Sequence, residues 1–280
     1  GSWLPRIPDV QQALGLGPQG LAIALLGLPC GTLLTLPFAG PLVGRIGPRR
    51  AIVIGMVLYS LATCLPALAP NPSLLFVALM LAGSSLSFVE LGLNVQADLV
   101  EKSSGAVIMT TSHGFWSVGI MLGSLLGSGL AGLGLTASLA IALVAAMVLP
   151  LALLVATALP VIQAAIPGDE KQRSAWAFPS WALLGICCFV FGITMTEGAM
   201  ADWSAIFLRD ALGAQAGTVG LGYAVFAMMV AAGRFGGDRL KRRFGAVTTA
   251  RICGSLALCG AAILFIAPST PIALVGFGII

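Results

Sequence analysis

A small number of ionisable and hydrogen-bonding side chains occur inside long apolar runs of this sequence. Glu90 and Asn94 are four residues apart, and Glu197 follows Thr194 by three, so each pair shares one face if its run is helical. The single histidine, His113, lies in a run between these pairs. A charged side chain in hydrocarbon costs about 2.5–3.5 kcal/mol, and such residues usually face a cavity. We predict that these five side chains line a pathway for a solute or a proton.

Each of these residues also has a structural interpretation, which is a hydrogen bond between two helices. This alternative weighs most for Asn94, because one amide can join two helices. It is evenly balanced for His113, because a neutral imidazole is cheaper to bury than a charge. A sugar ring can stack on an indole, and we therefore add Trp116 to the predicted pathway.

Glu90 and His113 are predicted to lie at the same depth. Each is eight residues from a polar connection, at Asp98 and Gly105 respectively, which corresponds to about 12 Å along a helix. Consecutive helices joined by a short loop are usually antiparallel neighbours, so the two side chains could share a proton. The alternative is that rotation about one helix axis turns one of them toward a different helix.

The elements that must hold these residues follow from composition. Of the 280 residues, 58% are hydrophobic and 9% are charged, and the mean hydropathy is +1.03. One soluble core cannot bury this much apolar surface, so the expected solvent is a lipid bilayer. The basic residues form short clusters between apolar runs, which disfavours nucleic acid as a partner. The cysteines lack the spacing of zinc or redox sites, and we expect no metal and no cofactor.

Long apolar runs recur along the whole chain. Roughly 20 apolar residues cross a bilayer as a helix, and lipid excludes spanning backbone that is not hydrogen-bonded internally. The runs are too long, and lack the alternation, for strands of a membrane barrel. An all-α membrane protein is therefore predicted. The predicted helices cover residues 20–43, 51–70, 73–97, 105–132, 136–160, 180–201, 216–237 and 248–267, and a further one begins near 271.

The distribution of Lys and Arg predicts the orientation. Only Arg6 and Arg209 occupy one set of alternate connections, and the much larger opposite set is predicted to be cytoplasmic. That set comprises Arg45, Arg49, Arg50, Lys102, Lys171, Arg173, Arg239, Lys241, Arg242, Arg243 and Arg251.

The chain also contains an internal repeat. A constant shift along the sequence places ALG at 13–15 on ALG at 211–213, and LVGRIG at 42–47 on LKRRFG at 240–245. Parallel repeats with a binding site at their interface are a transporter architecture. We expect an N-terminal helix bundle at 1–160, a cytoplasmic linker at 161–178 and an incomplete C-terminal bundle at 179–280.

The stretch GPLVGRIGPRR at 40–50 resembles the loop signature of the major facilitator superfamily, G-x-L-x-D-R-x-G-x-R-R. Gly44 stands where the family usually has an aspartate that latches the cytoplasmic side. Asp98 and Glu101, at the inner end of the 73–97 helix, are therefore expected to pair with the nearby arginines instead. The predicted cytoplasmic gate comprises Arg45, Arg49, Arg50, Asp98, Glu101, Asp238 and Arg239.

Two longer stretches, residues 89–119 and 197–245, are similar to the fucose-permease-related branch of that superfamily. This resemblance implies twelve helices, and this chain is then expected to lack most of the first helix and everything after the start of the tenth. It further implies a multi-pass protein of the bacterial inner membrane, acting as a monomer, whose substrate is a sugar or a related polar metabolite.

The sequence therefore predicts a secondary transporter of a small polar solute, working by alternating access between two six-helix bundles. Buried carboxylates can titrate near neutral pH, so Glu90 and Glu197 are candidates for carrying a coupled proton. The chain lacks a nucleotide-binding loop and the nucleophile-and-base or metal cluster of an enzyme, and we do not expect an enzyme. The alternatives left open are a non-transporting membrane receptor or sensor, and an efflux pump for drugs or metabolites.

Overall fold

The computed structural model describes residues 1–105, 108–161 and 181–280, and within these the side chains of Ala182 and Asp238 are not described. The described ranges contain helices and short connections and no strand. Among the described residues, seven helices are long and apolar enough to cross a membrane, which confirms the predicted all-α membrane fold. In chain order the elements are the 3-10 turn η1 (Leu4–Arg6), α1 (Ile7–Ala13), α2 (Pro18–Leu25), α3 (Gly27–Ile46), α4 (Pro48–Ala62), the 3-10 turn η2 (Pro66–Leu68), α5 (Pro72–Ser104), α6 (Met109–Gly132), α7 (Ala137–Ala158), α8 (Trp181–Asp210), α9 (Leu221–Phe244), α10 (Ala246–Ile266) and α11 (Thr270–Ile279).

The predicted helix at 20–43 consists of two segments, α2 and α3, with Leu26 between them. Pro29 has no N–H to donate to the carbonyl of Leu25, so one helical hydrogen bond is missing at this point. The ladder resumes with the bond from Cys30 N to Leu26 O at 3.0 Å. The interruption is local, and the two segments together form one membrane-length span.

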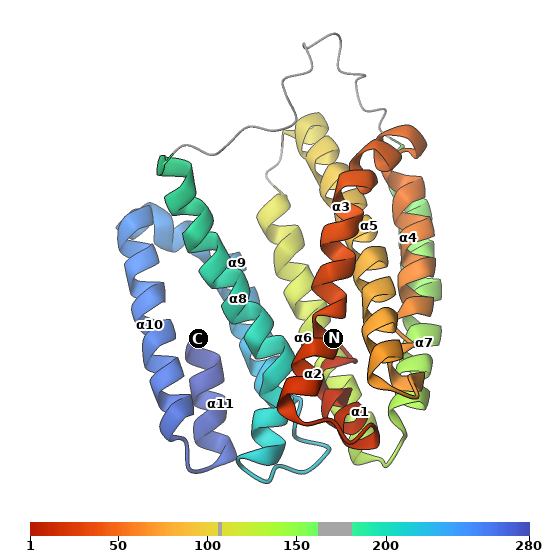
Figure 1. Cartoon of the computed structure of the whole chain (residues 1–280). Coiled ribbons are helices and arrows are strands. Elements are labelled where there is room, and N and C mark those ends of the chain that lie inside the picture. The colour runs from red at the N-terminus through yellow and green to blue at the C-terminus, as the bar shows by residue number, and fades with distance from the viewer. Residues whose placement is uncertain (106–107, 162–180) are drawn as a thin grey trace.

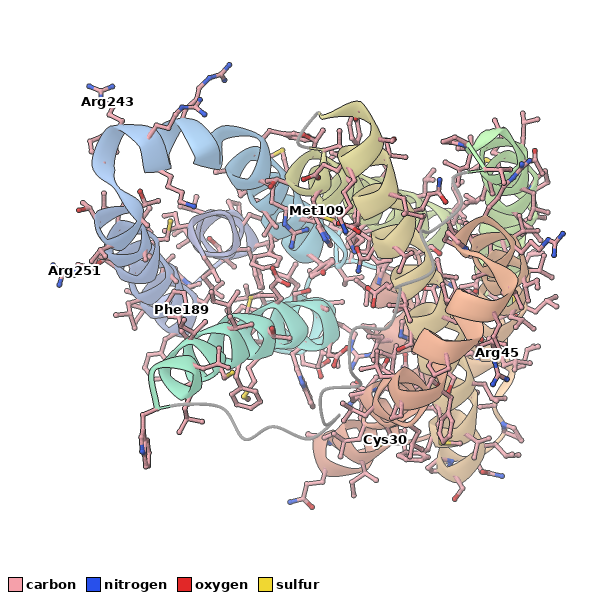
Figure 2. All side chains as sticks on the ribbon, turned by 90° about the horizontal axis from the view of Figure 1, so that it is seen from above. Cys30, Arg45, Met109, Phe189, Arg243 and Arg251 are labelled. Carbon is pink, nitrogen blue, oxygen red and sulfur yellow. The ribbon has the colours of Figure 1, made fainter. Side chains whose placement is uncertain are left out.

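Two groups of helices lie side by side (Figure 1). One contains α3, α4, α5 and α7, and the other contains α8, α9, α10 and α11. The main connection between the groups is α6, which packs along α9, and Figure 2 shows its first residue, Met109, next to that helix. The predicted linker at 161–178 lies outside the described residues except for Val161, and the predicted division into bundles stays a prediction.

The internal repeat is visible in the backbone. Gly15 and Gly213, which occupy equivalent places in the repeat, both adopt positive φ, at 60° and 64°. Gly47 and Gly245, which are equivalent in the same way, both do so between two consecutive helices, at 84° and 79°. L-residues with a Cβ rarely adopt this conformation, so the repeated glycines make the same two turns in each half.

Helices α3 and α5 pack through glycine. A Cβ on Gly31 would lie 1.9 Å from the carbonyl oxygen of Met80, and one on Gly83 would lie 2.0 Å from that of Leu28. The close approach lets Ser84 Oγ donate a hydrogen bond of 3.2 Å to Gly31 O across the contact. Small residues and interhelical hydrogen bonds are the usual means of helix association in lipid.

We expect the substitution Gly31→Ala to lower the free energy of unfolding by about 1–3 kcal/mol, because the added methyl group overlaps backbone atoms of α5. Gly40→Ala is the matched control on the same helix, since a Cβ there meets no atom within 4 Å. Thermal unfolding in detergent compares the two variants. Equal melting temperatures would contradict the packing role of Gly31.

Candidate functional site

Arg234, on α9, joins three helices through its side chain. Its Nη1 donates to His113 O at 2.9 Å and to Ser117 Oγ at 2.7 Å, both on α6. Its Nη2 lies 3.3 Å from Glu197 Oε1 on α8. The guanidinium thus binds a carboxylate of its own helix group, on α8, and two oxygens of α6, the helix that connects the two groups.

This cluster joins the middle of α8 and of α9 to the first turns of α6, which begins at Met109. Glu197 falls close to the midpoint of α8, and Arg234 falls close to the midpoint of α9. Tyr223, which is 8% exposed, lies within electrostatic range of Glu197 and Arg234. Charged Arg and Glu side chains are costly within a membrane-spanning segment, so their mutual pairing lowers the cost of both.

A cavity of about 290 Å³ lies beside this cluster, between α6, α8, α9 and α10. Arg234 and Lys241 line it together with Thr110 and Phe189. Lys241 is on the last turn of α9, so the cavity leads from the central cluster toward the end of the protein that we assign to the cytoplasm.

The two helix groups are joined along their outer halves. Ser124 Oγ donates to Gly220 O at 2.9 Å, and Gly220 N donates to Ser128 Oγ at 2.8 Å. Beyond these bonds, Arg209 donates to Pro8 O and to Gln11 Oε1, both at 2.6 Å. These four hydrogen bonds all lie between the outer ends of the helices and the depth of Arg234.

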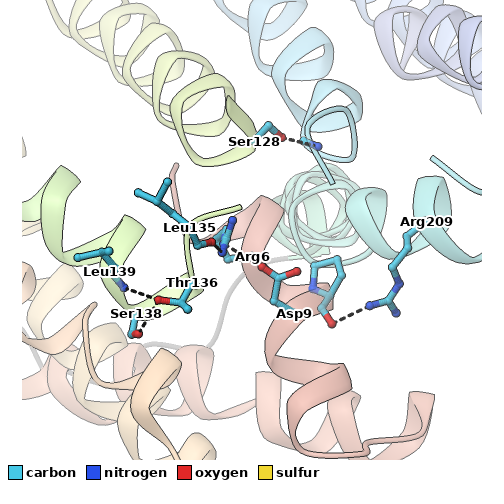
Figure 3. Close-up of polar contacts among 10 residues, drawn as sticks. Arg6, Asp9, Ser128, Leu135, Thr136, Ser138, Leu139 and Arg209 are labelled. Atoms are coloured by element: carbon cyan, nitrogen blue, oxygen red, sulfur yellow. Dashed lines mark hydrogen bonds and ion pairs between the residues drawn. The ribbon is translucent and has the colours of Figure 1, made fainter. Parts of the chain in front are cut away.

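The four hydrogen bonds just described form what we call the outer seal, and a second arginine, Arg6, lies in the same region (Figure 3). Arg6 is 2% exposed, donates to Leu135 O, and pairs with Asp9 at 2.9 Å. Burial raises the pKa of Asp9, while the positive charges of Arg6 and Arg209 act in the opposite direction. Of the two basic residues that the sequence places outside, Arg209 thus joins α8 to α1, and Arg6 joins the start of the chain to the connection between α6 and α7.

We expect Arg209→Gln to loosen this seal, because it removes the guanidinium that donates to Pro8 O and to Gln11 Oε1 on α1. Ser204 is 2% exposed on α8 and supplies a nearly isosteric reporter as Ser204→Cys, with the six native cysteines replaced by alanine. Its labelling by a reagent added outside should become at least about tenfold faster, as expected for loss of charge-assisted bonds. Arg251→Gln, at an exposed position on α10, is the control, and equal labelling rates in both variants would contradict the seal.

The family description of the Major Facilitator Superfamily matches residues 4–280. This chain belongs to that superfamily. It is 33% identical over 246 residues to an uncharacterized transporter of the same type from Yersinia pestis, covering 87% of this chain and 62% of that protein. It is 29% identical to an uncharacterized transporter of Sinorhizobium fredii, with 99% and 73% covered, and 29% identical to the membrane protein MosC of Rhizobium meliloti, with 100% and 67% covered.

In this major facilitator chain the predicted pathway residues fall into two sets. Glu197 belongs to the central cluster, and His113 contributes its carbonyl to it. Glu90 and Asn94 lie on a face of α5 that the other described elements leave exposed, and no described residue forms a hydrogen bond or ion pair with them. Thr194 donates to Val190 O within its own helix.

The structure shows no contact that tests two further predictions, the pathway role of Trp116 and the pairing of Glu90 with His113. Trp116 is half-buried one residue before Ser117. The predicted pair of Glu90 and His113 forms no hydrogen bond or ion pair in the described structure, where α6 packs on α9 more than on α5. The sharing of a proton between these two side chains therefore stays a prediction.

The predicted gate carboxylates have other partners than the arginines. Asp98 pairs with Lys102 at 2.7 Å, four residues on along the exposed end of α5. Glu101 Oε2 accepts hydrogen bonds from the backbone N–H of Ile108 and Met109, at 3.0 and 2.9 Å. A carboxylate at this position satisfies the free N–H groups at the start of α6, which explains why it does not reach the arginines.

The basic members of the predicted gate are also apart from these carboxylates. Arg49 donates to Thr157 O on α7, while Arg45 and Arg50 form no hydrogen bond or ion pair with the described residues. Arg239 is exposed at the end of α9, and the side chain of Asp238 lies outside what the structure describes. The gate stays a prediction for a different conformation of the protein.

Sequence reasoning missed the central position of Arg234, because hydropathy alone places this residue near the cytoplasmic end of its helix. The signal that could have identified it is the serine stripe on α6: Ser117, Ser124 and Ser128 are separated by seven and four residues and so share one face. A polar stripe in an apolar helix indicates a partner with donors, and α9 supplies Arg234 and the N–H of Gly220.

Proposed function

We propose that this chain carries the solute pathway of a secondary active transporter, which moves a small polar solute by alternating access and couples this movement to protons. The chain spans 62% of the length of the Yersinia relative, so this proposal concerns the whole protein. We further propose a sugar or related metabolite as the solute, the fucose-permease-related branch as the closer family, a monomer, and the bacterial inner membrane as the location.

The observation that carries this proposal is the placement of Arg234. It contacts α8 of its own helix group and α6, the main connection to the other group, and it lies beside a cavity and next to the carboxylate of Glu197. A group at such a position responds to a solute, to a proton and to the relative movement of the two halves. These are the three events that a coupled transporter has to connect.

Alternating access requires the outer contacts to open while inner contacts form. Opening the outside separates Ser124 and Ser128 from Gly220, and Arg209 from Pro8 and Gln11. Two neutral and two charge-assisted hydrogen bonds contribute roughly 4–9 kcal/mol in total. New contacts among the predicted gate residues would offset part of this loss. The remaining difference is within the range that binding of a solute can supply.

Protonation of Glu197 provides the link to the proton gradient. The neutral acid no longer attracts Arg234, so the guanidinium is free to follow α6 or to bind the solute. The charged acid holds Arg234 on α8 and α9. The two protonation states therefore favour different arrangements of the central cluster.

Counterflow in proteoliposomes tests the transport function. The full-length protein is reconstituted, loaded with an excess of unlabelled candidate solute, and given a trace of the radiolabelled solute outside. A transporter accumulates label transiently inside without any gradient, whereas a receptor binds the solute without exchanging it. Binding without exchange, for a solute that stabilises the protein in a thermal-shift screen, would overturn the proposal.

A further inference from the structure

A second, larger cavity of about 930 Å³ lies at the cytoplasmic end of the first helix group. Its described lining belongs to α3, α4, α5 and the residues that follow α7, so it is separate from the central cluster around Arg234. Arg45, Arg49 and Arg50 line it, and no described lining residue is acidic. The cavity therefore carries an excess of positive charge.

The nearby carboxylates do not neutralise this charge. Asp98 pairs with Lys102, and Glu101 caps α6, so neither reaches the three arginines. Gly44 supplies no side chain where a carboxylate could have stood. Within the described residues, the guanidinium groups of Arg45 and Arg50 therefore have no acidic partner and can bind an anion.

The backbone adds further donors. Helix α4 begins at Pro48 with Gly47 as its N-cap, and no side chain caps it. The N–H groups of Arg49 and Arg50 in its first turn have no acceptor inside the helix. A helix N-terminus attracts anions, and here it lies in the same cavity as the arginine side chains.

Gln96 is an independent sign of an absent ligand. It lines the same cavity and is 4% exposed, and its Nε2 donates to Pro160 O at 3.0 Å. Its Oε1 is buried without a donor among the described residues. A buried amide oxygen is rarely left without a partner, so the occupant of this cavity should carry a donor as well as an anion.

The rest of the lining is apolar and includes Val43, Ile54, Leu91 and Val95. A small soluble anion gains no favourable contact from these apolar side chains, whereas a lipid acyl chain packs against them. We propose that this cavity binds an anionic phospholipid of the cytoplasmic leaflet, with its phosphate at Arg45, Arg50 and the start of α4 and a headgroup hydroxyl near Gln96. Basic pockets between helices on this side of a membrane are suited to such headgroups.

Native mass spectrometry of the full-length protein in detergent tests this site, with phosphatidylglycerol as the probe and phosphatidylcholine as the neutral comparison. The variant Arg45→Gln/Arg50→Gln leaves Arg49 in place, because that residue holds Thr157 on α7. Each arginine contributes about fivefold at a charged lipid surface, so we expect phosphatidylglycerol affinity to fall about 25-fold. Arg45→Lys/Arg50→Lys keeps the charge and should restore most of the affinity.

Arg242→Gln/Arg243→Gln is the matched control, because it removes two exposed charges from the cytoplasmic end of α9. An equal loss in this control, or equal binding of phosphatidylcholine, would overturn the proposal. Displacement of the lipid by excess inorganic phosphate would identify a site for a free anion and would also overturn it.

A second variant tests the site without changing its charge. Gly44 lines the cavity, and a Cβ there meets no atom within 4 Å, so Gly44→Trp fills the space. We expect the same loss of phosphatidylglycerol binding while the melting temperature without lipid stays close to that of the unmodified protein. Full binding in this variant would contradict the cavity as the lipid site, even if the arginine variant failed to fold.

Discussion

Replacing Arg234 by glutamine is expected to reduce transport by at least about tenfold. The substitution removes one ion pair with Glu197 and two hydrogen bonds to α6. A charge-assisted hydrogen bond contributes roughly 1.5–3 kcal/mol, and about 1.4 kcal/mol already corresponds to a factor of ten. Because both side chains of the pair are partly exposed, we expect the free energy of unfolding to fall by only about 1–3 kcal/mol.

Initial rates of solute uptake and thermal unfolding of the same preparations measure both effects. Arg242→Gln is the control, since it removes a charge from an exposed position on the same helix. Arg234→Lys keeps the charge but not the planar fork, so it should recover stability more fully than transport. Normal uptake by Arg234→Gln would remove this residue from the pathway.

The double variant Arg234→Gln/Glu197→Gln separates stability from function. In the single variant Arg234→Gln, the carboxylate of Glu197 loses its cation within the membrane-length helix α8. The double variant leaves no charge unpaired, so it should be more stable than that single variant. Transport should remain lost in both. Recovery of transport in the double variant would show that the pair has a structural role alone.

Replacing Glu197 by glutamine is expected to abolish gradient-driven accumulation while leaving solute exchange within about twofold. Glutamine keeps the shape of the side chain and can still accept a hydrogen bond from Arg234, but it cannot take up a proton. Accumulation needs the proton step, whereas exchange of a bound solute needs only the movement of the two halves. We therefore expect the same variant to fail in the accumulation assay and to remain active in the exchange assay.

Accumulation under an imposed proton gradient and counterflow without one are compared in the same proteoliposomes. Thr196→Val is the control, because the Thr196 hydroxyl binds only Gly192 O within the exposed face of the same helix. Accumulation at the level of the unmodified protein would leave Glu197 with a structural role. Loss of both accumulation and exchange would assign it to solute binding instead of coupling.

The sequence by itself determined the order and approximate positions of the long apolar helices, because hydrocarbon imposes a minimum apolar length and an internally bonded backbone. It did not determine their full length, since α5 and α8 extend to Ser104 and Asp210, past the predicted ends at 97 and 201. It also located the repeat: the glycines at 15 and 213, and at 47 and 245, make matching turns because only glycine adopts their φ without strain. The boundary that hydropathy missed, at Leu26, follows from Pro29, a local effect within one turn.

Only the tertiary structure decided which polar residues meet. Periodicity places Glu197 and Thr194 on one face, but rotation about the helix axis and the choice of neighbour are properties of packing between segments far apart in the chain. Arg234 thus reaches Glu197 and Ser117, while Asp98 and Glu101 satisfy Lys102 and the start of α6. A charged residue within an apolar helix predicts that a polar partner is needed, and the packing of α6, α8 and α9 determines which partner is within hydrogen-bond distance.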